Sequence, residues 1–142
     1  MKSISEQLRT NAVALISLVV ALTALGYNTW RNERTEHNRN LRAAGFEVLT
    51  KLADFERVVF LAQYDHDPQN GNPRIGWSQV IVLNDLAEVL PPPVAVRAHA
   101  LRDIWSANWE TLGQSDEAAV GRIEDAINAL RVATLDTLRA LR

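Results

Sequence analysis

The feature that most constrains this chain is the apolar run at residues 12–27, which reads AVALISLVVALTALGY. It contains no charge and no proline, and Ser17 and Thr23 are the polar side chains inside it. No other stretch of the chain is comparable. A run of this kind belongs either in a bilayer or in a protein core, because exposing so much apolar surface to water is costly. It therefore decides in which solvent each part of the chain must fold.

A transmembrane helix needs roughly 20 mostly apolar residues to cross the hydrocarbon core. The polar residues on either side of the run can complete this length at the level of the headgroups. Tyr27 and Trp30 supply the amphipathic aromatic rings that favour the membrane interface. We therefore expect a single transmembrane helix at residues 11–30, preceded by a polar tail at residues 1–10.

Two other interpretations of the run stay open. A secretory signal peptide has a basic start, an apolar segment and small residues before the cleavage site. Ala24-Leu25-Gly26 fits that outline, and cleavage before Tyr27 would remove residues 1–26. A short apolar run can also be a buried core helix. The uncleaved anchor is favoured because the polar start is long for a signal and because the helical pattern continues past Trp30.

Composition limits the classes of function. A chain of 142 residues favours one domain beside the anchor. Lys and Arg number 15 against 17 Asp and Glu, whereas a nucleic-acid-binding protein usually concentrates positive charge, so no nucleic-acid partner is expected. The chain has no cysteine, which excludes disulfides and thiolate chemistry.

After the anchor, residues 32–40 are entirely polar but lack proline and glycine, so a solvated helix is favoured over a linker. An apolar stripe with alternating spacings of four and three then runs to Tyr64, which is typical of a bundle seam. Its members are Leu41, Gly45, Val48, Leu52, Phe55, Val59 and Ala62. We expect Phe46, Leu49, Ala53 and Phe60 to widen the buried face.

Three more helices are predicted, from about 77 to 90, from about 94 to 112, and from 115 to the end, separated by turns near 65–76, 91–93 and 113–115. Their seams are Val80, Leu83, Ala87 and Leu90; then Val94, Ala98, Leu101, Trp105, Asn108 and Leu112; then Val120, Ile123, Ile127, Leu130, Thr134, Leu138 and Leu141.

Flanking apolar side chains suggest that the second helix is buried on more than one side; these are Val82, Leu86 and Val89. Gly113 is expected just after a helix end, and Ser115 is expected to cap the last helix. Short connections favour antiparallel neighbours. The predicted fold is therefore all-α, with one N-terminal transmembrane helix that continues into a four-helix-bundle-like domain at residues 31–142.

The most chemical-looking cluster is Asp65, His66 and Asp67, because carboxylates and imidazole can bind a divalent metal. The spacing does not fit a calcium loop, since Asn70 stands where that loop needs glycine and Gly76 where it needs glutamate. Turn chemistry explains the cluster, so we assign no metal-binding residue and no cofactor.

No set of residues suggests a catalytic site. His37 and His99 show no activating partner in the sequence. Ser78, Ser106 and Ser115 lack the glycine-flanked turn of a hydrolase nucleophile. Gly71 and Gly76 fit neither a phosphate-binding loop nor a dinucleotide fingerprint. We therefore expect a protein without enzymatic activity.

The tryptophans and one glycine can be interpreted in two ways. Trp77, Trp105 and Trp109 can anchor an interface, but filling the core of the bundle is favoured. Trp105 and Trp109 are four residues apart and so share a helix face. Gly45, beside Ala44, either allows another helix to approach closely or is a tolerated weak point that costs about 1 kcal/mol relative to alanine.

Residues 26–49, GYNTWRNERTEHNRNLRAAGFEVL, resemble small single-pass bacterial membrane proteins to which no activity is attached. The resemblance implies an inner-membrane location and carries no residue roles. Positive charge near the anchor favours the C-terminal flank, with Arg31 and Arg34 closest, and so a cytoplasmic domain.

The functional class that fits best is a membrane-tethered interaction module, such as an accessory or assembly subunit with a protein partner. The alternative is a membrane-anchored sensor whose bundle binds a small ligand. Self-association is also expected, because Val58 and Phe60 lie beside the seam and because a membrane confines copies to two dimensions. The alternative to self-association is that the other helices of the same chain cover these side chains.

Overall fold

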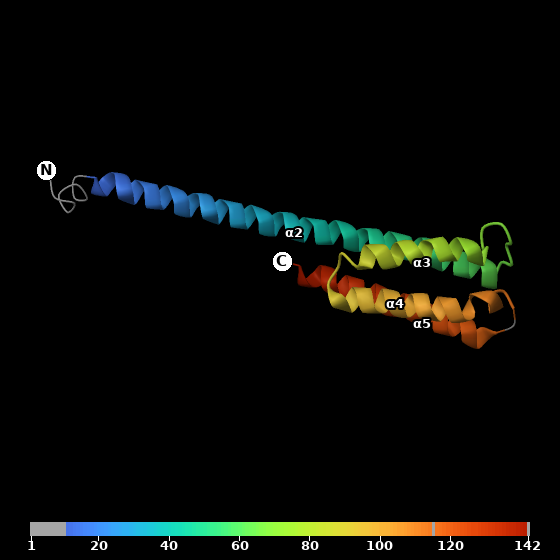
Figure 1. Cartoon of the computed structure of the whole chain (residues 1–142). Coiled ribbons are helices and arrows are strands. Elements are labelled where there is room, and N and C mark those ends of the chain that lie inside the picture. Colours follow the sequence, from blue (N-terminus) through green and yellow to red (C-terminus); the bar gives the residue numbers. More distant parts are fainter. Residues whose placement is uncertain (1–10, 115, 142) are drawn as a thin grey trace. The chain divides into compact units, whose positions relative to one another are not determined.

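The computed structural model describes residues 11–114 and 116–141, and its regular structure is helical throughout. The elements are α2 (Ala12–Gln63), α3 (Pro73–Ala87), α4 (Pro92–Asn108), the short 3₁₀ helix η1 (Trp109–Thr111) and α5 (Glu117–Ala140), shown in Figure 1. The all-α fold is confirmed. The predicted polar tail at residues 1–10 lies outside the described residues.

The chain divides into two compact units, residues 1–37 and 38–142, and α2 contributes to both. Within the described residues, α2 is the helix long and apolar enough to cross a membrane, and no residue of its most apolar stretch is buried. A signal sequence near an N-terminus satisfies the same criterion. The third interpretation, a core helix, is disfavoured because the run is exposed.

In the first unit, local contacts involve Thr23 and the residues at the end of the apolar segment. The hydroxyl of Thr23 donates to the carbonyl of Val19 at 2.8 Å, which leaves no donor unpaired in that side chain. The rings of Tyr27 and Trp30 lie 6.1 Å apart, and the guanidinium carbon of Arg34 is 5.7 Å from the centre of the Trp30 ring. The apolar segment therefore ends in an aromatic pair followed by a cation.

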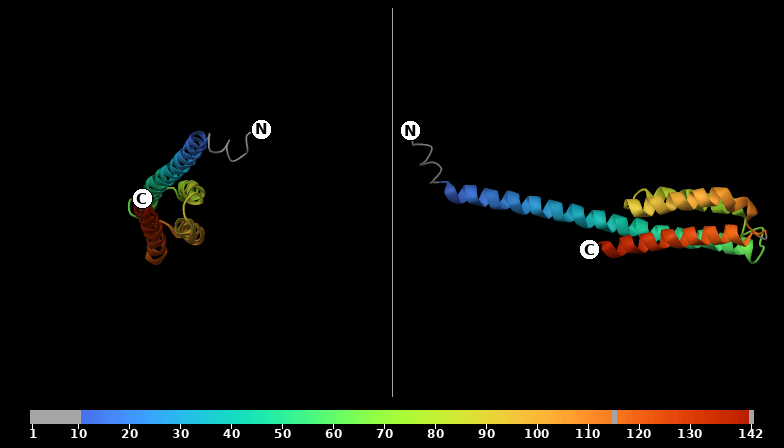
Figure 2. Two further views of the ribbon diagram at one scale, coloured as in Figure 1. Left: turned by 90° about the vertical axis from the view of Figure 1, so that its left-hand side faces the viewer. Right: turned by 90° about the horizontal axis from the view of Figure 1, so that it is seen from below.

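The second unit is a bundle of four helices, and both views of Figure 2 show α3 and α4 together on one side of α2 and α5. The predicted seams of α2, α3 and α4 are buried throughout. In α5 the seam is buried as far as Thr134, and Leu138 and Leu141 are half-buried. Spacings of three and four thus identified the inward face of each helix.

Trp105 of α4 is the centre of the core. Its ring is fully buried and stands edge-on to Phe55 of α2, with 5.0 Å between the ring centres. On α3, a Cβ atom at Gly76 would lie 2.4 Å from Cζ2 of Trp105. The indole therefore fits only because position 76 has no side chain, and it joins three helices at one point.

Contacts between α2 and α5 close the bundle. Gly45 leaves room for Leu138, whose Cδ2 would be 2.7 Å from a Cβ at position 45. The glycine thus makes room for a leucine side chain of a neighbouring helix, so Gly45 has a packing role, although the neighbouring backbone is not what approaches it. Arg131 pairs with Glu56 on the same helix pair.

Both ends of α3 and of α4 differ from the prediction, and α3 ends at Ala87 rather than near Leu90 while α4 begins at Pro92 rather than near Val94. Helix α3 begins at Pro73 rather than near Trp77, because the side chain of Asn72 accepts the Arg74 N–H at 3.0 Å and proline is well suited to the first turn. Helix α4 ends at Asn108 rather than Leu112 and passes into η1.

The last helix has a cap other than the one predicted. The Asp116 carboxylate accepts the Ala119 N–H at 3.0 Å, whereas Ser115, the expected cap, lies outside the described residues. Gly113 has φ +81, as expected of a residue after a helix end.

The predicted width of the apolar faces was wrong. Phe46 and Phe60 are exposed rather than part of the core, and so are Val82 of α3 and Val89, which follows that helix. In a bundle of four helices, each helix turns one stripe inward, so apolar residues beside that stripe remain at the surface. Val58, which was expected to contribute to self-association, is instead buried within the bundle.

Gly76→Ala should destabilise the bundle by about 1–3 kcal/mol, because the new methyl group overlaps the buried indole of Trp105. The matched control is Gly121→Ala on α5, where a Cβ has no neighbour within 4 Å and alanine should stabilise the helix by about 1 kcal/mol. Urea unfolding of the full chain in detergent, followed by tryptophan fluorescence, measures both. Equal stability of the two variants would contradict the packing described for Trp105.

Candidate interaction surface

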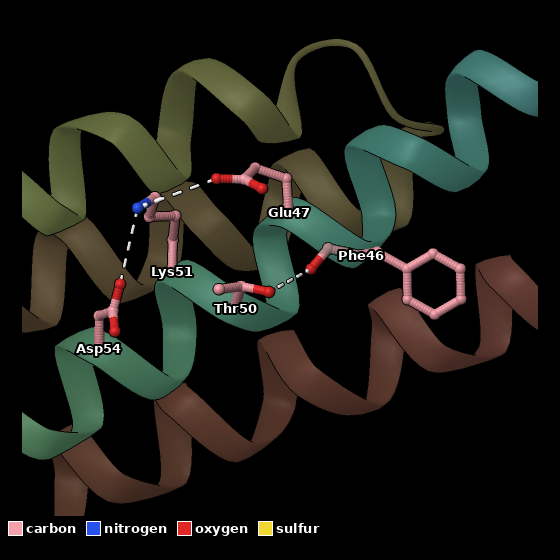
Figure 3. Close-up of polar contacts among 5 residues, drawn as sticks. All are labelled: Phe46, Glu47, Thr50, Lys51 and Asp54. Atoms are coloured by element: carbon pink, nitrogen blue, oxygen red, sulfur yellow. Dashed lines mark hydrogen bonds and ion pairs between the residues drawn. The ribbon is translucent and has the colours of Figure 1, made fainter.

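The largest apolar side chains that the bundle leaves exposed lie along α2 and at the residue that directly follows it. Phe46 is 61 % exposed, Phe60 52 % and Tyr64 55 %. With the exposed Ala53 they are spaced by seven, seven and four residues, which places them on one side of the helix, away from the core seam. We call these four residues the outer stripe. Figure 3 shows Phe46 on a different side of α2 from Lys51, which pairs with Glu47 and Asp54.

The C-terminal end of the outer stripe is held in place by neighbouring groups. The rings of Phe60 and Tyr64 lie 5.1 Å apart. The hydroxyl of Tyr64 donates to Oε1 of Glu124 on α5 at 3.2 Å, and the negative charge of Glu124 is the main reason that the pKa of Tyr64 is raised. An aromatic pair fixed in this way needs little further ordering to serve as a contact surface.

A groove of about 360 Å³ between α2 and α5 adjoins the outer stripe. Its floor includes Val59 and Ile127 of the core, and charged side chains stand at its rim. The full lining is Ala53, Glu56, Arg57, Val59, Phe60, Glu124 and Ile127. An apolar floor with a polar rim is the usual anatomy of a protein contact site.

Two further hollows lie between α4 and α5. The first, of about 330 Å³, is lined by Arg97, Ala100, Ile104, Arg122, Asp125, Ala126 and Ala129. The second, of about 770 Å³, is lined by Pro92, Pro93, Val96, Arg97, Ala129, Val132, Ala133 and Asp136. Both include Arg97 and Ala129, so they adjoin one another.

An arginine and an asparagine link α4 to α5 beside these hollows. Oδ1 of the buried Asn108 accepts from Nη2 and Nε of Arg122 at 2.6 and 3.2 Å. The amide nitrogen of Asn108 donates to the carbonyl of Ile104 at 2.6 Å. The seam spacing predicted Asn108 on the inward face, whereas no pattern in the sequence indicated Arg122 as its partner on the next helix.

The cluster of Asp65, His66 and Asp67 lies in the connection between α2 and α3. Oδ1 of Asp67 accepts the N–H groups of Gln69 and Asn70 at 2.9 and 3.0 Å, and its Oδ2 accepts from the Asn70 side chain at 2.7 Å. These bonds, led by the one from the Asn70 side chain, lower the pKa of Asp67. The carboxylate thus organises the turn, as the turn chemistry of the sequence indicated.

The described residues contain no group of three or more His, Asp or Glu side chains placed to hold a metal ion. In the same connection, a Cβ at Gly71 would lie 2.4 Å from the backbone nitrogen of Ala62, so this glycine lets the loop pack against the end of α2. Close packing thus accounts for Gly71, as it does for Gly76.

His99 is a largely exposed histidine with a partner that the sequence pattern did not indicate. Its Nε2 lies 2.8 Å from Oε1 of Glu88, across the turn between α3 and α4, and both side chains are largely exposed. His37 is exposed on α2. The hydroxyl of Ser78 donates to the carbonyl of Ile75, a bond within the first turns of α3, and Ser106 is exposed.

The tryptophans fill space in the bundle, as predicted, to different degrees. Trp105 is fully buried, whereas Trp77 and Trp109 are partly buried and pack against the core. The latter two form an edge-on pair with 6.4 Å between ring centres. None of these three tryptophans is among the exposed apolar side chains of the bundle, which include those of the outer stripe.

No family model, curated protein or solved structure matches this chain. Of the expected resemblance to single-pass membrane proteins, the structure supports one long apolar helix near the N-terminus, and no family is identified.

Asp67→Ala should lower the melting temperature of the protein at neutral pH. The folded-state pKa of Asp67 is depressed below its ordinary value of 3.8, so the carboxylate contributes stability above that pH and loses it as the pH falls through the depressed value. The difference in melting temperature between wild type and variant should therefore narrow below about pH 4. Thermal melts between pH 2 and 7 measure it, and a difference independent of pH would contradict the role assigned to the charge.

Phe60→Glu should leave the bundle folded, whereas Val58→Glu should destabilise it by about 3 kcal/mol or more, since an unpaired carboxylate would be buried. Circular dichroism and urea unfolding of the two full-length variants distinguish these outcomes. Unfolding of the Phe60→Glu variant would mean that this side chain supports the fold and is not a free contact surface.

Proposed function

We propose that this protein is a membrane-tethered helical interaction module, an accessory or assembly subunit without a reaction of its own. The observation that carries this proposal is the outer stripe, where aromatic side chains stand exposed beside a groove with an apolar floor. Aromatic residues are enriched at the energetic centres of protein contacts, and the Phe60–Tyr64 pair is already ordered. The expected partner is another protein.

The tether in this proposal is the apolar start of α2, inserted as an uncleaved single-pass helix in the inner membrane. Support comes from its length and exposed apolar surface, and from the aromatic pair of Tyr27 and Trp30 followed by Arg34. The positive charges that follow, from Arg31 to Arg42, favour a cytoplasmic location for the bundle.

The absence of enzymatic activity is part of the proposal. Among the described residues, the groups with shifted pKa values are Tyr64 and Asp67, and each shift is explained by a neighbour that holds a surface contact or a turn. A catalytic site usually gathers such groups in one cleft. These two belong to separate features of the bundle.

The second candidate function is a sensor that binds a small ligand. The first α4–α5 hollow favours it, since about 330 Å³ is the size of a small-molecule site and Arg97, Arg122 and Asp125 would supply polar contacts to an apolar ligand body. Thermal shift screening of the purified protein with small carboxylates distinguishes it. Stabilisation that is lost in Arg97→Ala would favour the sensor over the interaction module.

The tether is tested by alkaline carbonate extraction and by intact mass. The protein should stay in the membrane pellet with its N-terminal segment retained. A mature chain that starts at Tyr27, or release into the supernatant, would contradict an uncleaved anchor. Either result leaves the outer stripe available as a contact surface, so the two parts of the proposal can fail separately.

The contact surface is tested by photo-crosslinking in cells. A benzophenone amino acid replaces Phe46 or Phe60, and a control carries it at Arg102, which is exposed on α4. We expect a defined protein adduct from the two positions of the outer stripe and none from Arg102. Equal labelling at all three positions, or adducts with lipid only, would contradict the interaction module.

A further inference from the structure

The leucines of the apolar segment form a pattern that the anchor alone does not require. All four leucines of residues 12–27 stand at positions 15, 18, 22 and 25, spaced by three, four and three. This is the spacing of the a and d positions of a heptad, and all four side chains are exposed in the described helix. A helix that only had to dissolve in lipid would need no such order.

The residue before each leucine is small, which gives the leucine face a second property. Ala14, Ser17, Ala21 and Ala24 repeat the same spacing of three, four and three. A row of large side chains beside a row of small ones offers both the knobs and the holes of a packed helix pair, and small residues let helices approach closely in a membrane. The β-branched residues Val13, Ile16 and Val20 lie on the other side of the helix.

We infer that the leucine face, residues Leu15, Leu18, Leu22 and Leu25, binds the same face of a second copy of this chain. The inference rests on the membrane tether proposed above. A bilayer inserts all copies in one direction and at one depth, so each leucine layer would meet the identical layer of its partner without any shift.

Charge also fits a second copy. Residues 12–27 carry no charge, so pairing brings no unmatched ion into the bilayer. The hydroxyl of Thr23 already donates a hydrogen bond to the carbonyl of Val19, so its proton needs no acceptor on a partner helix. Confinement to two dimensions raises the effective concentration, which lets a modest contact suffice.

The absence of native cysteine allows a direct test, because an introduced thiol is the sole thiol of the chain. Single cysteines at positions 14 to 25 of the full-length protein, oxidised in native membranes, should give disulfide-linked dimers with maxima at 15, 18, 22 and 25. Cysteines at Ile16 and Val20 should crosslink poorly. Uniform crosslinking, a maximum on the Ile16–Val20 side, or no dimer at any position would overturn the inference.

A second pair of variants separates the face from general loss of apolar volume. In the Leu15→Cys protein, Leu18→Ala with Leu22→Ala should reduce the dimer fraction about tenfold, whereas Ile16→Ala with Val20→Ala should change it by less than about twofold. Carbonate extraction of each variant shows whether it is still membrane-inserted. Insertion without dimers would overturn this inference alone, and release by carbonate would overturn the tether and the inference together.

Discussion

The bundle depends on the fit of one indole. Trp105 fills the centre where α2, α3 and α4 meet, with Phe55 edge-on at 5.0 Å and the bare backbone of Gly76 against its six-membered ring. Because protein interiors are close-packed, an aromatic ring held on three sides fixes the distances between those helices. The fourth helix is then placed by Leu138 over Gly45 and by the bond from Arg122 to Asn108.

The inward faces of the helices could be predicted from sequence because spacing alone determines which residues share a side. The residues assigned to the seams within 41–62, 80–90 and 94–112 are buried. The width of each face could not be predicted in the same way. Phe46 and Phe60 are as apolar as the seam residues, and only the positions of the other helices decide that they stay outside.

The contacts of the candidate surface were also beyond sequence analysis. Tyr64 and Glu124 are 60 residues apart, and Arg122 and Asn108 are on different helices. No local pattern announces such a pair, because the partner is determined by the rotation of a neighbouring helix about its axis. The partner of His99 could not be predicted either, although Glu88 is near it in sequence, because the turn between α3 and α4 brings the two side chains together.

One backbone amide joins the end of α2 to the segment between α4 and α5. The N–H of Gly113, in the left-handed conformation that follows η1, donates to the side chain of Gln63, the last residue of α2. A Cβ at position 113 would also lie 3.0 Å from the carbonyl oxygen of Ala62. Because of this hydrogen bond, we expect the last turn of α2 and the segment between α4 and α5 to unfold locally together. Fraying at the end of α2 frees this amide to exchange with solvent, even though 50 residues of chain separate the two partners.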